Sequence, residues 1–184
     1  GKRDGWLARY GSGGGRKWVR RRGTSEKEDI KSVTVGPGGG IYVTGTTGKG
    51  LGGQSYSGGS TDSFIARYDS SASRKWIRLF GTSSSDSSHS LAVSSTGDIY
   101  VGGHTRGNLG NQMNTGGTDG FVQEYDQSGN RKSAWMFGTS GTETLYGLAV
   151  DGKGDLFAAG YTTNALGGQM YSGGFSDAYL MFVK

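Results

Sequence analysis

A seven-residue pattern that begins with aspartate recurs along this chain at spacings of 58, 57 and 58 residues. Its copies are Asp4-Gly-Trp-Leu-Ala-Arg-Tyr10, Asp62-Ser-Phe-Ile-Ala-Arg-Tyr68, Asp119-Gly-Phe-Val-Gln-Glu-Tyr125 and a last copy, Asp177-Ala-Tyr-Leu-Met-Phe182. The chain therefore divides into one repeat domain with units at residues 4–61, 62–118 and 119–176, followed by an extra strand at 177–184.

Three further motifs keep the same order in every unit. The first is Gly-Thr-Ser with an acidic residue five positions after the glycine, the second is a short β-branched or aromatic run ending in glycine, and the third is Leu-Gly-x-Gln followed by Gly-Gly. In the second unit they are Gly81-Thr82-Ser83 with Asp86, Ile99-Tyr-Val-Gly-Gly103 and Leu109-Gly-Asn-Gln-Met-Asn-Thr-Gly-Gly117. Alternating and β-branched runs separated by glycine turns predict four strands per unit, with the third and fourth forming a hairpin.

We expect an all-β fold, because 38 glycines and a single proline suit short strands joined by tight turns. A unit of about 57 residues lies in the range of β-propeller blades. Propellers use four to eight blades, so three units predict either a homodimer in which a second chain completes the ring or a piece of a longer propeller. A β-trefoil, which also has three units of four strands, is the alternative.

Composition limits the setting and the chemistry. The absence of cysteine excludes disulfides and cysteine-ligated zinc, and no apolar stretch is long enough for a membrane span. The chain does not begin with Met, and we expect an extracellular, secreted protein. His89 and His104 both fall in the second unit without equivalents elsewhere, so the sequence predicts no catalytic or metal centre and no enzyme activity.

Positive charge is concentrated in the first unit. Residues 1–61 carry 11 basic and 4 acidic side chains, whereas residues 119–184 carry 4 and 7. Its centre is a basic run that predicts a patch for anionic partners such as sulfated glycans, formed by Arg16, Lys17, Arg20, Arg21 and Arg22. The alternative is a solvated edge strand kept soluble by its charge. A nucleic-acid partner is not favoured, because one cluster without a recognisable module is a weak signal.

The ordered motifs resemble the SBBP β-propeller repeat, a family found largely in bacterial proteins. The resemblance rests on Asp-x-Phe-x-x-x-Tyr, a following tryptophan, Gly-Thr-Ser with its acid, Ile-Tyr-Val-x-Gly-x-Thr and Leu-Gly-x-Gln with Gly-Gly, and it covers nearly the whole chain. It implies one four-stranded blade per repeat. It implies no catalytic signature and no single ligand, because propellers serve many functions.

Antiparallel strands place successive loops at alternate ends of a blade, so the Gly-Thr-Ser turn and the Leu-Gly-x-Gln loop should share one face. That face combines amide, carboxylate and aromatic groups, the mixture that sugar recognition needs. The predicted carbohydrate-binding residues are Gln54, Tyr56, Asp62, Gln112, Asn114, Asp119, Gln169, Tyr171 and Asp177. In the alternative interpretation, the aspartates cap the Gly-Gly turns by accepting backbone hydrogen bonds.

The sequence thus predicts a multivalent, lectin-like propeller whose partners are glycans or glycoproteins. The alternative is a structural or surface-associated scaffold that binds partners through its basic first repeat. No cofactor is expected, and Ca²⁺ held by the acid-containing loops is a minor alternative. Trp18, Trp76 and Trp135 are expected in the core between blades.

Overall fold

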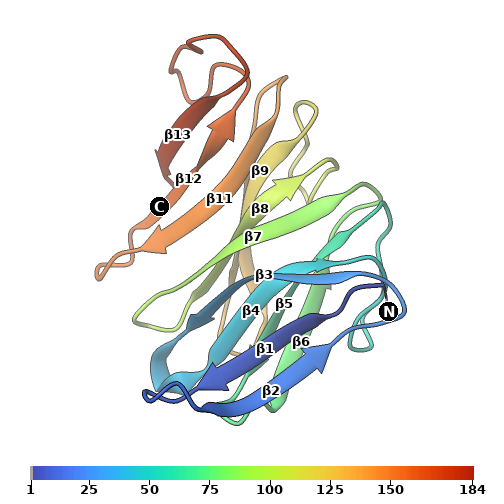
Figure 1. Ribbon diagram of the computed structural model, residues 1–184. Coiled ribbons are helices and arrows are strands. Elements are labelled where there is room, and N and C mark those ends of the chain that lie inside the picture. The colour runs from blue at the N-terminus through green and yellow to red at the C-terminus, as the bar shows by residue number, and fades with distance from the viewer. Residues whose placement is uncertain (1) are drawn as a thin grey trace.

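The computed structural model describes residues 2–184 and is built from strands, as the sequence predicted (Figure 1). One short 3-10 turn, Pro37–Gly39, interrupts the otherwise β-structured chain. The strands are β1 (Gly5–Tyr10), β2 (Arg16–Arg22), β3 (Glu28–Val35), β4 (Ile41–Thr47), β5 (Asp62–Tyr68), β6 (Arg74–Phe80), β7 (Asp86–Val93), β8 (Ile99–Thr105), β9 (Asp119–Tyr125), β10 (Arg131–Phe137), β11 (Glu143–Val150), β12 (Leu156–Thr162) and β13 (Asp177–Phe182).

The strands form separate antiparallel sheets that follow one another along the chain. Two sheets have four strands, in the orders β3-β4-β5-β6 and β7-β8-β9-β10, while β1-β2 and β11-β12-β13 have two and three. Strand β7 packs against β3 and β4, and β11 packs against β7 and β8, so the first strands of successive sheets lie side by side (Figure 1). These are propeller blades, and residues 2–184 show no β-trefoil barrel.

The blades and the sequence repeats have the same length but different starting points. The repeated aspartate pattern forms β1, β5, β9 and β13, and in the four-stranded sheets this is the third strand. The repeat at 62–118 therefore supplies the last two strands of one blade and the first two of the next. The expectation of one blade per repeat is wrong in phase, while the predicted hairpin of the third and fourth repeat strands is confirmed as β3-β4, β7-β8 and β11-β12.

The two end sheets are incomplete relative to their neighbours. Strands β1 and β2 correspond to the outer pair β5 and β6, and β13 pairs with β12 as β5 pairs with β4. Within residues 2–184, no strand follows β13 in its sheet. Completion of a ring by a second copy of the chain stays a prediction.

The core lies between successive blades and consists of large aromatic and aliphatic side chains. Trp18, Trp76 and Trp135 each pack against one of three buried clusters, which confirms their expected place. The indole N–H of Trp18 donates to the carbonyl of Ser70 at 3.2 Å, and that of Trp76 donates to the carbonyl of Gln127 at 3.0 Å. Trp18 and Trp76 therefore each join their strand to a turn of the next blade, 52 and 51 residues further along.

A β-bulge interrupts the first strand of each blade. The strand register shifts around Lys31 in β3, His89 in β7 and Tyr146 in β11, and these residues are 58 and 57 positions apart. A bulge adds one residue to its strand and re-aims that residue's side chain. The bulge therefore occupies the same place in β3, β7 and β11, but its residue differs in type: lysine, histidine and tyrosine.

The bulge explains the glycine that ends the β-branched run. A Cβ atom on Gly103 would lie 1.9 Å from the carbonyl oxygen of Ser87, the residue two before the bulged His89. Because a backbone atom cannot move aside cheaply, only glycine fits here. The same conflict, at 1.8 Å and 1.9 Å, faces its equivalents, Gly45 and Gly160.

Candidate functional site

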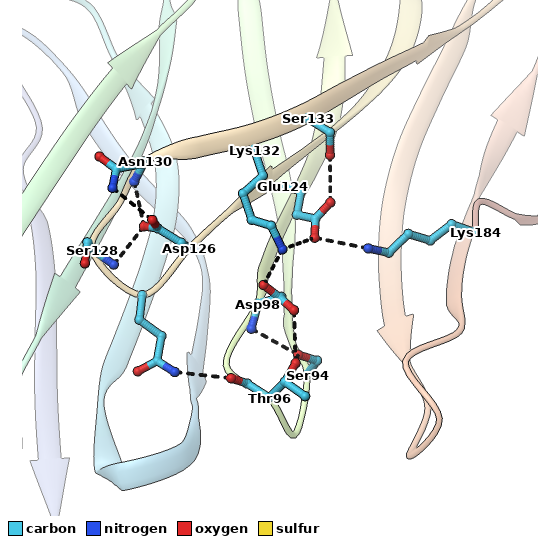
Figure 2. Close-up of polar contacts among 11 residues, drawn as sticks. Ser94, Thr96, Asp98, Glu124, Asp126, Ser128, Asn130, Lys132, Ser133 and Lys184 are labelled. Carbon is cyan, nitrogen blue, oxygen red and sulfur yellow. Dashed lines mark hydrogen bonds and ion pairs between the residues drawn. The ribbon is translucent and has the colours of Figure 1, made fainter.

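The predicted sharing of loop faces is confirmed. The hydroxyl groups of Ser60 and Ser85 lie 2.5 Å apart, which places the first glycine-rich loop beside the second Gly-Thr-Ser turn. At the opposite end, the amide of Gln127 donates to the carbonyl of Thr96 at 3.2 Å, joining the turn before β10 to the β7-β8 hairpin (Figure 2).

The acid that follows each Gly-Thr-Ser turn holds that turn closed. Glu143 is fully buried, and its carboxylate accepts hydrogen bonds from the Thr139 N–H, the Thr139 hydroxyl and the Thr162 hydroxyl, each at 2.7 Å. Glu28 and Asp86 make the equivalent bonds to Thr24 and Thr82. These carboxylates clasp the connection between consecutive blades and are not exposed to a ligand on the loop face.

The aspartates in the predicted sugar site also serve the loops. Asp62 and Asp119 are buried, and their carboxylates accept hydrogen bonds from the backbone N–H groups of Ser57 at 2.5 Å and Thr115 at 2.7 Å. Burial, together with the nearby Asp86, raises the pKa of Asp62. The half-buried Asp177 accepts from Ser172 at 2.6 Å. These carboxylates therefore cap the loops, as the alternative interpretation of the sequence expected. Their role as sugar ligands stays a prediction.

The aromatic and amide members of the predicted site belong to three separate loops. The hydroxyls of Tyr56 and Tyr171 donate to the carbonyls of Gly59 and Gly174, so each tyrosine closes its own loop. Asn114 does the same by accepting from the Gly116 N–H at 3.1 Å.

The three glutamines of the predicted site lie in the corresponding loops. Gln112 and Gln169 are exposed, and Gln54 is half-buried. The predicted residues therefore form one similar loop per repeat and are not brought into a single shared site.

The third of these loops lines a cavity of about 670 Å³. Its lining combines Gln169, Tyr171 and Asp177 from the predicted set with Asn164 and Leu180. It extends along β13, whose Leu180 is 78% exposed. Strand β13 corresponds to β5 and β9 of the four-stranded sheets, where a fourth strand, β6 or β10, pairs with it. The cavity lies along a strand that has no such fourth partner within residues 2–184. A volume of this size suits a small ligand.

The predicted basic patch is the strand β2, which pairs only with β1 within residues 2–184 and forms a sheet edge. Arg16, Lys17, Arg20, Arg21 and Arg22 are all exposed. The guanidinium of Arg21 lies 3.3 Å from the carboxylate of Asp4, and that of Arg22 lies 6.0 Å from the centre of the Tyr68 ring. The five cations are thus gathered along one strand and open to solvent.

A second charged cluster, missed from the sequence, surrounds Glu124 on β9 (Figure 2). This 5% exposed carboxylate accepts hydrogen bonds from Lys132 at 3.0 Å, Ser133 at 2.7 Å and Lys184 at 3.1 Å. Burial opposes ionisation, but these hydrogen bonds prevail and lower the pKa of Glu124 to about 2. Because Lys184 follows β13, the cluster ties the sheet β7-β8-β9-β10 to the sheet β11-β12-β13.

Comparison with known proteins identifies one segment of the chain. Residues 75–111 match the SBBP family model, described as a beta-propeller repeat. This segment is an SBBP beta-propeller repeat. It runs from β6 through β8, so the SBBP match crosses from one blade to the next, as the sequence repeats do.

A curated relative contains a related stretch. The chain is 30% identical over 133 residues to the regulatory protein FlaEY of Caulobacter vibrioides. The alignment covers 66% of this chain and 14% of that protein. The aligned part of the chain thus corresponds to about one seventh of a much longer relative.

Both histidines of the chain lie inside this SBBP segment and contact each other. His89 Nε2 and His104 Nδ1 are 3.1 Å apart, and the Tyr146 ring stands 5.2 Å from the His89 ring. Burial, the neighbouring His104 and Lys31 lower the pKa of His89 to about 4, and burial and Arg106 lower that of His104. The register of the β7-β8 hairpin pairs Ser87 with His104 and has its irregularity at His89, and this arrangement brings the two histidines together.

Proposed function

We propose that this chain is a non-catalytic β-propeller binding module that attaches to polyanionic partners through the edge strand β2. The observation that carries the proposal is the alignment of Arg16, Lys17 and Arg20 with two further arginines on one exposed strand. A row of fixed cations attracts a polymer of sulfate or carboxylate groups more strongly than it attracts a single anion. The name of the relative FlaEY, a regulatory protein, also fits a role in binding rather than catalysis.

The test replaces Arg16, Lys17 and Arg20 with serine and measures binding to a heparin oligosaccharide at low salt. We expect affinity to fall about ten-fold, since three weak ion pairs together supply about 1.4 kcal/mol. Binding of the unmodified chain should also weaken as salt rises, because solvent-exposed charges are screened.

The matched control replaces Lys49, Arg131 and Lys153, three exposed cations outside β2, with serine. This variant has the same net charge as the β2 variant. If both variants lose affinity equally, attraction depends on net charge alone and the proposed role of β2 is wrong.

The cavity beside β13 favours carbohydrate binding as a second candidate function. Gln169 and Tyr171 line it together with the apolar Leu180 and Met181, so hydrogen-bonding and apolar groups meet in one hollow. Because Tyr171 also closes its loop, replacing this tyrosine would disturb the loop as well as a bound sugar. Gln169 is exposed and is the better residue to test.

The variant Gln169→Ala should lose about ten-fold in affinity for neutral glycans on an array read at high salt, because one amide contact contributes about 1 kcal/mol. Gln112→Ala, at the equivalent exposed position of the preceding repeat, should retain the affinity. High salt separates this binding from that of β2. Absence of neutral-glycan binding by the unmodified chain would contradict the lectin proposal.

An extracellular or secreted setting stays a prediction. Within residues 2–184, the structure has no helix with the length and apolar character needed to cross a membrane.

A further inference from the structure

The two histidines of the chain are its only imidazole groups, and their side chains contact each other on the sheet β7-β8-β9-β10. His89 is the bulged residue of β7, and His104 lies on the adjacent strand β8. The ring centres are 5.0 Å apart with an interplanar angle of 32°, and the facing nitrogens are 3.1 Å apart. One proton between the two nitrogens joins the rings by a hydrogen bond.

The separation of these nitrogens also suits a metal ion. Imidazole nitrogens bind Zn²⁺ at about 2.0–2.1 Å. Two nitrogens 3.1 Å apart, each about 2.05 Å from one ion, subtend an angle of about 98° at that ion. This angle lies between the square-planar and tetrahedral values. An ion can therefore take the place of the shared proton with little change in the nitrogen separation, if the two rings turn toward the ion and the donor ring carries its proton on its other nitrogen.

The surroundings select the class of ion. Residues 2–184 contain no group of three or more His, Cys, Asp or Glu side chains that could hold a metal, so imidazole nitrogens would be the protein ligands and water would fill the other positions. Hard ions such as Ca²⁺ need oxygen ligands and are not favoured, whereas Cu²⁺ binds nitrogen ligands most strongly among divalent first-row ions. Lys31 and Arg106 add positive charge near the rings and weaken the binding of any cation.

We propose that His89 and His104 form a two-histidine site for a transition-metal ion, with Cu²⁺ bound more tightly than Zn²⁺. The site lies at the bulge, where His89 has no partner in the β7-β8 ladder and its side chain contacts His104, which pairs with Ser87. The other two bulges carry Lys31 and Tyr146, so the site exists once in the repeated fold. It is independent of β2 and of the cavity beside β13.

The test titrates the untagged chain with CuSO₄, and separately with ZnSO₄, in a non-coordinating buffer at neutral pH. Isothermal titration calorimetry should show one Cu²⁺ per chain with a dissociation constant in the micromolar range. His89→Gln and His104→Gln should each weaken Cu²⁺ binding at least ten-fold. Circular dichroism of each variant checks that the fold is retained.

Lys31→Met provides a second measurement that does not remove a ligand. Lys31 is exposed, and its replacement removes a positive charge near the ion, so Cu²⁺ binding should become several-fold tighter. Unchanged affinity in this variant would locate the ion elsewhere and overturn the proposal. Retention of Cu²⁺ affinity by the double variant His89→Gln/His104→Gln, or no binding by the unmodified chain at millimolar Cu²⁺, would also overturn it.

Discussion

Replacing Gly103 with alanine is expected to lower the free energy of unfolding by about 3 kcal/mol or more, or to prevent folding. The new Cβ atom would meet the Ser87 carbonyl oxygen at 1.9 Å and the Ser88 Cα at 2.7 Å. Both are backbone atoms of the paired strand β7, so relief requires the strands to separate or the bulge to be lost. Overpacking usually costs about 1–3 kcal/mol, and contact with backbone places this case at the upper end.

Urea denaturation followed by circular dichroism measures the effect of Gly103→Ala. The matched control is Gly152→Ala, because a Cβ on Gly152 meets nothing within 4 Å and its φ is not positive. This control should change stability by no more than about 0.5 kcal/mol. A Gly103→Ala protein as stable as the control would show that the bulge is not needed to hold β7 against β8.

The strand content of the fold could be predicted from the sequence because the four-strand pattern is written three times. The phase of the blades could not. Both β5-β6 and β4-β5 are antiparallel neighbours, but β5 and β6 are joined by a short turn, whereas β4 and β5 are joined by the long loop at residues 48–61. Local turn signals reveal the first kind of pairing. The pairing of β4 with β5 depends on how the whole loop at residues 48–61 packs, and the spacing of the repeats carries no information about that packing.

The predicted site shows the same limit. Repetition identified the Gly-Gly loops, and parity placed them correctly at one end of the blades. Repetition did not separate residues that face solvent from residues that support the loop. Gly81 illustrates why: a Cβ there would lie 2.4 Å from the Asp62 carboxylate, which reveals that the aspartate and the Gly-Thr-Ser glycine pack directly together. The two motifs recur together because they contact each other in the fold.

Charge clusters that form across blades were not visible in the sequence. Glu124, Lys132 and Lys184 are separated by 8 and 52 residues, and the equivalents of Glu124 in the first two copies of its pattern are Arg9 and Arg67. An acid at this position therefore breaks the repeat, and this departure is the sequence signal that could have drawn attention to Glu124. Its consequence for stability is the second large expected effect.

Replacing Glu124 with glutamine is expected to lower the free energy of unfolding by about 2 kcal/mol at pH 7. The unmodified carboxylate has a pKa lowered from 4.5 to about 2 in the folded chain. A shift of this size corresponds to at most about 3.4 kcal/mol, and the exposure of Lys132 and Lys184 reduces it, since water screens their charges. Glutamine keeps the shape of the side chain and removes its charge.

The pH dependence distinguishes this cause from a simple packing defect. A carboxylate whose pKa is lower in the folded than in the unfolded chain stabilises the fold above pH 4.5, and this contribution disappears as the pH falls toward 2. The stability difference between the unmodified chain and Glu124→Gln should therefore shrink from about 2 kcal/mol at pH 7 to about 0.5 kcal/mol at pH 2.5, if both are measured by urea denaturation at each pH.

Asp98→Asn is the matched control for the Glu124 cluster. The Asp98 carboxylate lies 2.7 Å from the Lys132 ammonium but is more exposed than Glu124, and Lys184 pairs with Glu124 instead (Figure 2). Its replacement should cost about 0.5 kcal/mol, as expected for a surface ion pair. If the loss of stability in Glu124→Gln stays constant between pH 7 and pH 2.5, packing sets the stability at this position. The ion pairs that join β9 to the end of β13 would then not be its cause.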